Sequence, residues 1–320
     1  MKLLVLTAMW PDDTVATYGV VVAREVDAWR VAGHDVDVVT KPRGYRGYPV
    51  ALRELRRRLA SGRYDALHVH YGTMAALLLV AGRLPRTVLT LHGSELTTGW
   101  RPTRSRYFIQ WWLTAIGGLR ASTVIVQAEF MRRMLPPWLR RRAVVLPQPV
   151  DVERFRRDDR PLRDDTVRDD SVLFLARRQV PVKRFDLARK AARIAGADDR
   201  LRSLDEFPPE LLPRAMATAR VGLLTSAREG APVALKEAVA AGLPVVAVDL
   251  PGVREVAERV PGAVDLVSED PHDIAAALQR RLGGQRPAAD AASWLAAFTA
   301  HGWTTDAHRT ALTRLLEPSR

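Results

Sequence analysis

The chain has 320 residues, of which 47% are hydrophobic, and this is enough apolar material for two cores of ordinary size. It contains no cysteine, which excludes a disulfide framework and a thiolate metal site. The net charge is +13, and residues 1–150 hold nearly all of the excess, with 22 basic against 10 acidic side chains. We therefore expect the first half of the chain to meet something anionic.

The apolar N-terminus, residues 1–11, could be mistaken for a signal peptide. A Pro-Asp-Asp run follows it where a cleavage site needs small residues, so a buried parallel strand explains it better. No apolar run is as long as a membrane-spanning helix requires. These features predict a cytoplasmic protein, either soluble or peripheral on the inner face of the cell membrane.

Short apolar runs alternate with helical patterns in the first half, which predicts repeated βα units and a doubly wound parallel sheet. The expected strands are residues 3–7, 36–40, 66–70, 88–91, 123–126 and 144–146. The expected helices are residues 19–32, 50–61, 73–82 and 103–119. Proline residues break this pattern from Pro147, and a tract rich in Arg and Asp runs on to Asp170. We place a domain boundary there.

The second half resumes the same alternation. The expected strands are residues 171–175, 221–225, 245–248 and 263–267. The expected helices are residues 185–195, 208–219, 271–282, 290–300 and 304–317. The predicted fold class is α/β, with an N-terminal domain at 1–148, a C-terminal domain at 149–302 and a terminal helix at 303–320.

The clearest functional pattern lies in residues 226–244, between two expected strands. Strand, loop, helix and strand form a βαβ unit whose first turn faces a ligand at the carboxyl edge of the sheet. Backbone amides at the start of the helix can hold an anion. The residues expected to bind the ligand there are Gly230, Ala231, Pro232 and Val233.

Two carboxylates, Glu229 and Glu237, stand eight positions apart around this turn. Because a carboxylate repels an anion, their use beside an anion site is to accept hydrogen bonds from hydroxyl groups. A ligand that offers both phosphate and many hydroxyls is a nucleotide sugar. The pattern therefore predicts a nucleotide-sugar site.

The same segment resembles the Glu-x7-Glu signature of family-4 glycosyltransferases, with Glu-Gly-x-Pro and Glu-Ala-x-Ala-x-Gly-x-Pro both present. The resemblance implies the GT-B architecture, two Rossmann-like doubly wound domains facing a central cleft, with the terminal helix returning to the N-terminal domain. It implies retention of anomeric configuration without a metal cofactor. It also implies that Glu229 contacts the transferred sugar and Glu237 the ribose. The stretch from Lys183 to Phe207 lacks the family's usual Gly-rich loop, so the donor domain is expected to be trimmed, as in compact bacterial members.

Arg178 and Lys183 lie five positions apart, directly after an expected strand, and match the family's Arg-x4-Lys motif. Two cations in one such loop can stabilise the charge that a departing nucleoside diphosphate gains as the glycosidic bond breaks. Ordinary surface charge in an arginine-rich protein is the alternative interpretation.

Three residues of the first half are weaker candidates. His92 ends an expected strand beside Gly93, and the resemblance implies a hydrogen bond from it to the donor rather than a nucleophile. Gly19 opens the first helix, where a glycine allows close approach of the backbone to a ligand, although a turn would also require one. The resemblance implies that this ligand is the donor diphosphate. Glu95 is a candidate on the acceptor side.

Metal binding finds little support in the sequence. His68 and His70, two positions apart, could share a metal, but the sequence shows no third ligand, and a structural role explains them as well. Asp35 and Asp37 have the spacing of a metal motif, but strand alternation explains them better. We assign no metal site.

Arginine accompanies apolar residues in the first half, notably in residues 52–59 and 131–142, with an uncharged aromatic run at 107–116 between them. Such surfaces suit anionic lipid, although core-facing helices with solvated arginines would produce the same sequence pattern. A nucleic-acid partner is less favoured because no recognised module is visible.

Taken together, these patterns predict an enzyme, a retaining glycosyltransferase that uses a UDP- or GDP-sugar. The expected acceptor is a lipid-linked or cell-envelope glycan, as in bacterial polysaccharide biosynthesis. Glycosylation of nucleic acid or of a small natural product by the same fold is the first alternative. A catalytically inactive nucleotide-sugar-binding protein is the second.

Overall fold

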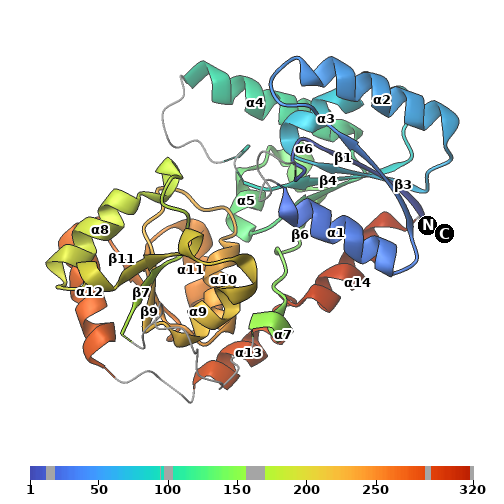
Figure 1. Cartoon of the computed structure of the whole chain (residues 1–320). Helices are drawn as coiled ribbons and strands as arrows, with labels where there is room; N and C mark the ends of the chain where they lie inside the picture. Colours follow the sequence, from blue (N-terminus) through green and yellow to red (C-terminus); the bar gives the residue numbers. More distant parts are fainter. Residues whose placement is uncertain (12–18, 94, 97–103, 156–169, 285–289, 318–320) are drawn as a thin grey trace. The chain divides into compact units, whose positions relative to one another are not determined.

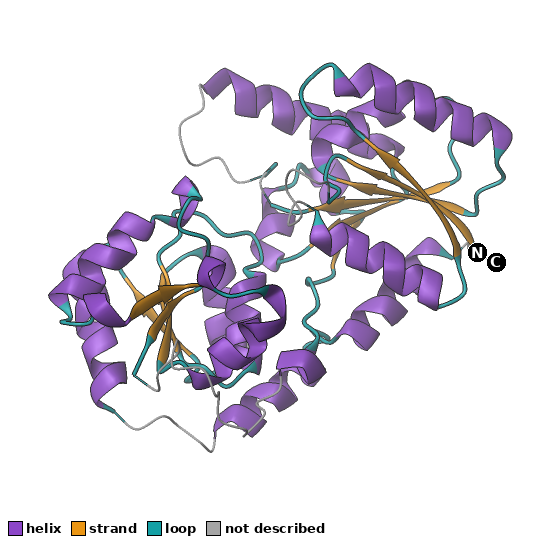
Figure 2. Cartoon of the chain, viewed as in Figure 1, coloured by secondary structure: helices purple, strands orange, loops and turns teal. Residues whose placement is uncertain are grey.

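The computed structural model describes residues 1–11, 19–93, 95–96, 104–155, 170–284 and 290–317. It divides the chain into two compact units. Unit 1 comprises Met1–Leu146 together with Thr310–Arg320, and unit 2 comprises Pro147–Arg309. Each unit is a parallel sheet with helices on both of its faces (Figure 1, Figure 2). The chain thus enters unit 2 at the proline-rich segment and returns to unit 1 at its end.

The described residues of unit 1 form one parallel sheet of six strands in the order β2-β1-β3-β4-β5-β6. The strands are β1 (Lys2–Thr7), β2 (Asp35–Thr40), β3 (Ala66–His70), β4 (Arg86–Leu91), β5 (Thr123–Val126) and β6 (Ala143–Val145). The helices are α1 (Val20–Val31), α2 (Gly47–Ser61), α3 (Gly72–Leu78), α4 (Arg104–Gly117), α5 (Glu129–Met134), α6 (Pro137–Arg140) and the end of α14 (Thr305–Leu316).

Alternating side chains of these strands form two separate cores, because successive residues of a strand point to opposite faces. On one face, under α1 and the end of α14, the core includes Leu3, Val5, Val26, Ala66, Val88, Leu312 and Leu316. On the other face, under α2 and α3, it includes Leu4, Leu6, Leu55, Leu67, Val69, Met74 and Leu89. His68 and His70 follow Ala66 on the first face, so that two polar rings replace apolar side chains at the carboxyl end of β3.

In unit 2 the described residues form a parallel sheet of five strands in the order β11-β10-β9-β7-β8. The strands are β7 (Val172–Phe174), β8 (Leu201–Ser203), β9 (Val221–Leu224), β10 (Val245–Val248) and β11 (Val264–Val267). The helices are α7 (Val152–Phe155), α8 (Phe185–Ile194), α9 (Leu212–Thr218), α10 (Val233–Ala240), α11 (Pro251–Arg259), α12 (Pro271–Gly283) and α13 (Asp290–Ala300). Buried aliphatic side chains again fill both faces.

Each sheet has one point where the strand order reverses. In unit 1 the chain moves from β1 outward to β2 and then returns to β3 on the other side of β1. In unit 2 it moves from β7 to β8 and then to β9 on the other side of β7. Open α/β sheets bind ligands outside the carboxyl ends of the strands at such a switch point. The β1/β3 and β7/β9 edges are therefore where function is expected.

Several expected elements differ in length from the observed ones. The helix expected at 73–82 ends at Leu78, and α9 is preceded by a separate 3-10 turn at Pro209–Leu211 instead of forming one helix from 208. The sequence pattern does not predict β8, α11 or the short helices α5, α6 and α7. The missed strand has Arg and Ser at two of its three positions, so it does not form an apolar run like the strands that were expected.

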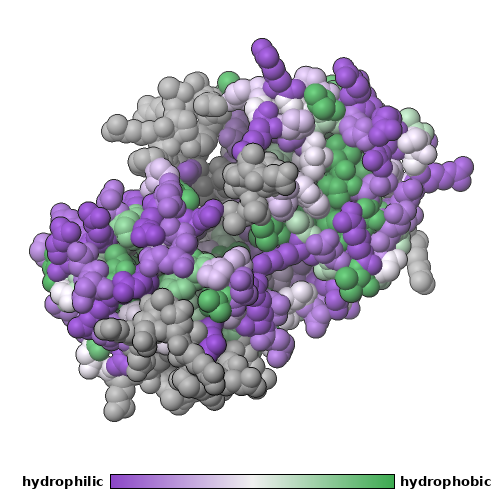
Figure 3. Space-filling model, viewed as in Figure 1, coloured by the Kyte–Doolittle hydropathy of each residue, from purple (hydrophilic) through white to green (hydrophobic). Residues whose placement is uncertain are grey.

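Among the described helices, none combines the length and the apolar character needed to cross a membrane. On the face drawn in Figure 3, hydrophilic residues cover most of the described surface.

Candidate active site

The two sequence motifs of unit 2 meet at its switch point. Lys183 follows β7 and Glu229 follows β9, and Lys183 Nζ donates a hydrogen bond to Glu229 Oε1 over 2.7 Å. Ser226 Oγ donates to the same oxygen. The Glu229 side chain is 8% exposed and that of Lys183 is 27% exposed, so the pair lies at the edge of the folded unit. The Lys183 ammonium group and the Glu229 carboxylate are thus in direct contact, although 46 positions separate them in sequence.

Further hydrogen bonds fix the loops that carry this pair. The Ala227 amide donates to the Val182 carbonyl over 2.9 Å, and Thr225 Oγ1 donates to the Lys183 carbonyl over 2.9 Å. Arg184 Nε donates to the Thr225 carbonyl over 2.7 Å. The loop after β7 and the loop after β9 are therefore tied together, which holds the Lys183–Glu229 pair in place before any ligand arrives.

Arg178 lies in the same loop as Lys183 but is held by the loop after β8. Its Nε donates to Asp205 Oδ2 over 3.2 Å, and its backbone amide donates to Asp205 Oδ1 over 3.3 Å. Burial raises the pKa of Asp205, but hydrogen bonds from Ser203, Arg178 and Gln179 outweigh it and bring the value to about 2. Asp205 is thus a permanent anion that orients the Arg178 side chain, which is 43% exposed.

The turn that begins α10 lies against another helix. The helix begins at Val233, directly after Pro232, so the predicted anion-binding turn from Gly230 stands at its amino end. A Cβ atom added to Gly252 of α11 would lie 2.3 Å from the Gly230 carbonyl oxygen. Only a glycine at Gly252 lets α11 approach this turn so closely. The packing of α11 against this turn therefore positions the loop that carries Glu229.

Glu237 lies on α10, one turn after the helix begins, and is half-buried. Its contact with a ribose stays a prediction.

Gly19 precedes α1 at the switch point of unit 1. Its φ is 78°, in the region that favours glycine, and a Cβ atom there would lie 2.4 Å from the Met9 carbonyl carbon. Close approach of the chain to itself thus requires a glycine here whether or not a ligand binds. The predicted contact with a diphosphate stays a prediction.

His92 follows β4 and uses both of its ring nitrogens within unit 1. Nε2 lies 3.2 Å from His70 Nδ1, and Nδ1 lies 3.1 Å from Gln127 Nε2. The ring also stacks on Tyr71, with centroids 4.7 Å apart. Burial lowers the pKa of His92, which favours the neutral imidazole. A hydrogen bond to a sugar, as predicted from the sequence, would have to replace one of these two contacts.

Glu95 is 3% exposed, and its Oε1 accepts hydrogen bonds from the backbone amides of His92 and Gly72 over 3.0 and 3.2 Å. It therefore joins the end of β4 to the start of α3. This contact makes it a residue that positions His92, and the acceptor role suggested by the sequence stays a prediction.

His68 and His70 face the acidic residue Glu25 of α1, which the sequence analysis did not single out. Glu25 Oε1 lies 3.0 Å from His68 Nδ1 and 3.4 Å from His70 Nε2. Burial raises the pKa of Glu25, but the adjacent His68 and His70 outweigh it and hold the value well below normal. Burial also lowers the pKa of His70 to about 3, so that ring stays neutral.

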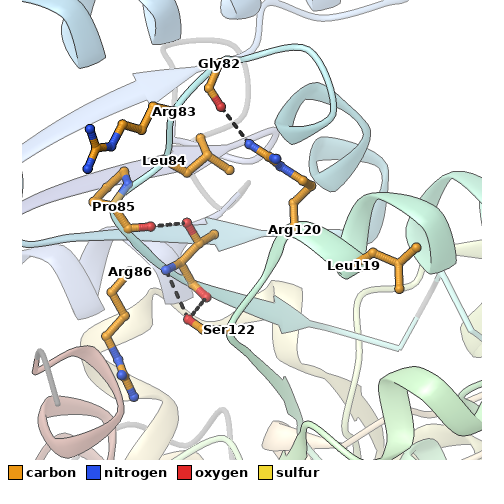
Figure 4. Close-up of a pocket in the computed structure, with 9 residues that line it drawn as sticks. Gly82, Arg83, Leu84, Pro85, Arg86, Leu119, Arg120 and Ser122 are labelled. Atoms are coloured by element: carbon orange, nitrogen blue, oxygen red, sulfur yellow. Dashed lines mark hydrogen bonds between the residues drawn. The ribbon is translucent and has the colours of Figure 1, made fainter.

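A separate pocket of about 530 Å³ opens at the amino end of β4, the edge opposite to His92. Figure 4 shows its lining, which includes Arg83, Arg86 and Arg120, with Arg120 donating to the Gly82 carbonyl over 2.6 Å. It contains none of the predicted site residues. Its position at the amino edge of the sheet also distinguishes it from the switch point.

Similarity to solved structures identifies the fold. The sucrose-phosphate synthase of Thermosynechococcus elongatus aligns with a TM-score of 0.77 and 16% identity, covering 98% of both chains. HepE of Anabaena, in complex with UDP, aligns with a TM-score of 0.71 and 15% identity, covering 99% of both chains. A trehalose-6-phosphate synthase, OtsA, aligns at 0.70 and 15%, over the full length of both chains. Together with the two sheets, these similarities define a GT-B fold and confirm the predicted fold class.

Two family models match the chain. The model for Glycosyltransferase Family 4 matches residues 18–154, and the model for Glycosyl transferases group 1 matches residues 172–283. The chain therefore belongs to the family-4-like glycosyltransferases, and the resemblance stated from its motifs is confirmed. No curated protein sequence matches it significantly.

Proposed function

We propose that this glycosyltransferase takes its sugar from a uridine diphosphate sugar and transfers it with retention of configuration. The observation that carries the proposal is the meeting of Lys183 and Glu229 at the β7/β9 switch point. HepE of Anabaena binds UDP and UDP-glucose in its solved structures, which supports uridine over guanosine here.

In this proposal each residue of the unit 2 site has one role. Lys183 and Arg178 neutralise the charge that the diphosphate gains as the glycosidic bond breaks, and the amides at the start of α10 add to this. Glu229 accepts hydrogen bonds from the sugar, and Glu237 accepts them from the ribose. Catalysis is then mainly a matter of positioning and electrostatic stabilisation.

Thermal unfolding with added nucleotides tests the choice of donor. We expect UDP and UDP-sugars to raise the melting temperature, because a ligand at about 100 times its dissociation constant stabilises the native state by about 2.7 kcal/mol. We expect uridine to have a much smaller effect because it lacks the phosphates. A larger rise in melting temperature with GDP than with UDP would indicate a guanosine donor instead. No rise with any nucleoside diphosphate would refute the proposal. The anomeric configuration of the product, read by NMR, tests retention.

For the acceptor, we propose a lipid-linked glycan at an anionic membrane surface. Helix α4 supports this because it exposes apolar side chains where a soluble surface would be polar, with Phe108 63% and Ile109 57% exposed. A basic segment adjoins the end of α4, since Arg142 donates to the Leu119 carbonyl over 3.0 Å. Apolar groups beside cations suit a lipid interface better than they suit nucleic acid.

Vesicle binding tests this surface. We expect sedimentation with anionic vesicles, little with neutral ones, and loss of binding as salt shortens the screening length. Replacing Phe108 and Ile109 together by serine should weaken binding about tenfold or more, because each removes apolar area from the interface. The matched control is Val31→Ser, since Val31 is 87% exposed on α1. Equal loss in the control, or preference for duplex DNA at the same salt, would contradict the proposal.

A further inference from the structure

Three side chains that the proposed reaction does not use converge at the β1/β3 switch point of unit 1. They are Glu25 from α1 and His68 and His70 from β3, and one ligand-type atom from each lies within 4.8 Å of the other two. Both histidine side chains are 1% exposed, and that of Glu25 is 15% exposed. The cluster is therefore shielded from solvent on the side of the two histidines and accessible to solvent on the side of Glu25.

The separations match those between ligands of one metal ion. A tetrahedral Zn²⁺ holds nitrogen and oxygen ligands about 2.0–2.2 Å away, which places two ligand atoms about 3.3 Å apart. Glu25 Oε1 lies 3.0 Å from His68 Nδ1 and 3.4 Å from His70 Nε2. Two of the three separations thus match those of a metal-binding triad, and all three atoms lie within 4.8 Å of one another.

Directions distinguish this arrangement from ordinary hydrogen bonding. Although both nitrogens are close enough to Glu25 Oε1, neither His68 Nδ1 nor His70 Nε2 makes a hydrogen bond with any described residue. Their N–H directions miss the carboxylate oxygen. A metal ion would give these two buried nitrogens a partner, whereas a buried N–H without an acceptor would be costly.

The opposite nitrogen of each ring has a partner of its own. His68 Nε2 lies 2.8 Å from Thr90 Oγ1, and His70 Nδ1 lies 3.2 Å from His92 Nε2. Histidines that bind metals usually donate their other N–H to a protein acceptor, which fixes the ring and leaves the ligating nitrogen unprotonated. Thr90 and His92 are placed to accept these two hydrogen bonds.

We propose that Glu25, His68 and His70 form a binding site for a divalent transition-metal ion, with Zn²⁺ as the best match to two imidazoles and one carboxylate. Such a donor set suits zinc and leaves a fourth position for water. The ion would tie α1 to the carboxyl end of β3. When His70 Nδ1–H donates to His92 Nε2, the proton of His92 lies on Nδ1, and the Gln127 side-chain amide must then turn its oxygen instead of its nitrogen toward that N–H. This site belongs to unit 1, whereas Lys183 and Glu229 belong to unit 2, and metal binding tests it independently of the proposed sugar transfer.

Metal titration of the full-length chain without a histidine tag tests the site. After removal of metal with a chelator, we expect one equivalent of Zn²⁺ to bind and to raise the melting temperature. Co²⁺ in its place should give the visible absorption bands of tetrahedral nitrogen and oxygen coordination. Glu25→Gln and His70→Gln should each weaken binding at least tenfold, since loss of even an outer partner of a metal ligand costs about 10- to 100-fold.

The matched control is His272→Gln, which removes an exposed histidine of α12 and should bind Zn²⁺ like the wild type. Melting of the metal-free variants shows whether they are folded, and the conservative Glu25→Gln change remains informative if His70→Gln does not fold. The proposal is overturned if the wild-type chain binds no stoichiometric metal, or if Glu25→Gln binds it as tightly as the wild type does.

Discussion

Replacing Lys183 by alanine is expected to slow sugar transfer about 100- to 1,000-fold, the usual effect of removing one group that stabilises developing negative charge. Lys183 lies at the β7/β9 switch point and its side chain is 27% exposed. Its ammonium group can therefore move from Glu229 to a phosphate without being buried on the way. Steady-state rates of UDP release with acceptor measure the effect. Affinity for UDP should fall as well, whereas affinity for uridine should not.

The loss of Lys183 also leaves Glu229 without its cation, so the folded state must be checked by thermal unfolding. Lys190→Ala is the matched control, because Lys190 is exposed on α8 in the same unit. If Lys183→Ala weakened uridine binding as much as UDP binding, the lysine would act on the fold of the site and not on the phosphate.

Replacing Gly252 by alanine is expected to lower both stability and transfer, although Gly252 is not among the proposed ligand-binding residues. The new Cβ would lie 2.3 Å from the Gly230 carbonyl oxygen and 3.2 Å from that of Glu229, so the loop that carries Glu229 must move. Crowding of this kind costs about 1–3 kcal/mol. We expect transfer to fall more than tenfold, because misplacement of a positioning group by about 1 Å can cost about 100-fold.

The matched control for this change is Gly283→Ala at the end of α12, where an added Cβ meets nothing within 4 Å. A helical glycine replaced by alanine without a clash should be neutral or stabilising. Chemical denaturation and steady-state kinetics compare the two variants. Wild-type kinetics for Gly252→Ala would mean that the Glu229 loop accommodates the methyl group and that its position does not limit transfer.

The sequence predicted two doubly wound parallel sheets because its strands are apolar runs separated by helical periods, and buried parallel strands have that composition. The GT-B architecture followed from the resemblance of its motifs to family-4 glycosyltransferases. The sequence also indicated that Lys183 and Glu229 belong to one site, since both follow strands at the carboxyl edge. It could not predict β8, in which Arg202 and Ser203 leave no apolar run, or the exact ends of helices such as α3.

The residues that the sequence did not predict are those brought close by tertiary contacts. Asp205 supports Arg178 from 27 positions away, across two neighbouring strands. Glu25 reaches His68 only because α1 packs over β3, and nothing in a helical Glu distinguishes it from a solvated charge before that packing is known. His68 and His70 were recognised as a pair, but their third partner depended on the order of the strands in the sheet.

The end of α14 has a consequence for the order in which the chain can fold. Leu312 and Leu316 pack against Leu3 and Val5 of the first strand, and Arg86 Nε donates to the Leu315 carbonyl over 2.8 Å. A ribosome therefore releases the last apolar side chains of unit 1 only after it has made the whole of unit 2. Unit 2 is one continuous stretch of chain and can fold as soon as it emerges from the ribosome. The core around β1, by contrast, is complete only when the end of α14 has been synthesised and packs against it. A fragment cut after Leu146 would lack part of its own core, so the two halves of this gene do not correspond to two separable proteins.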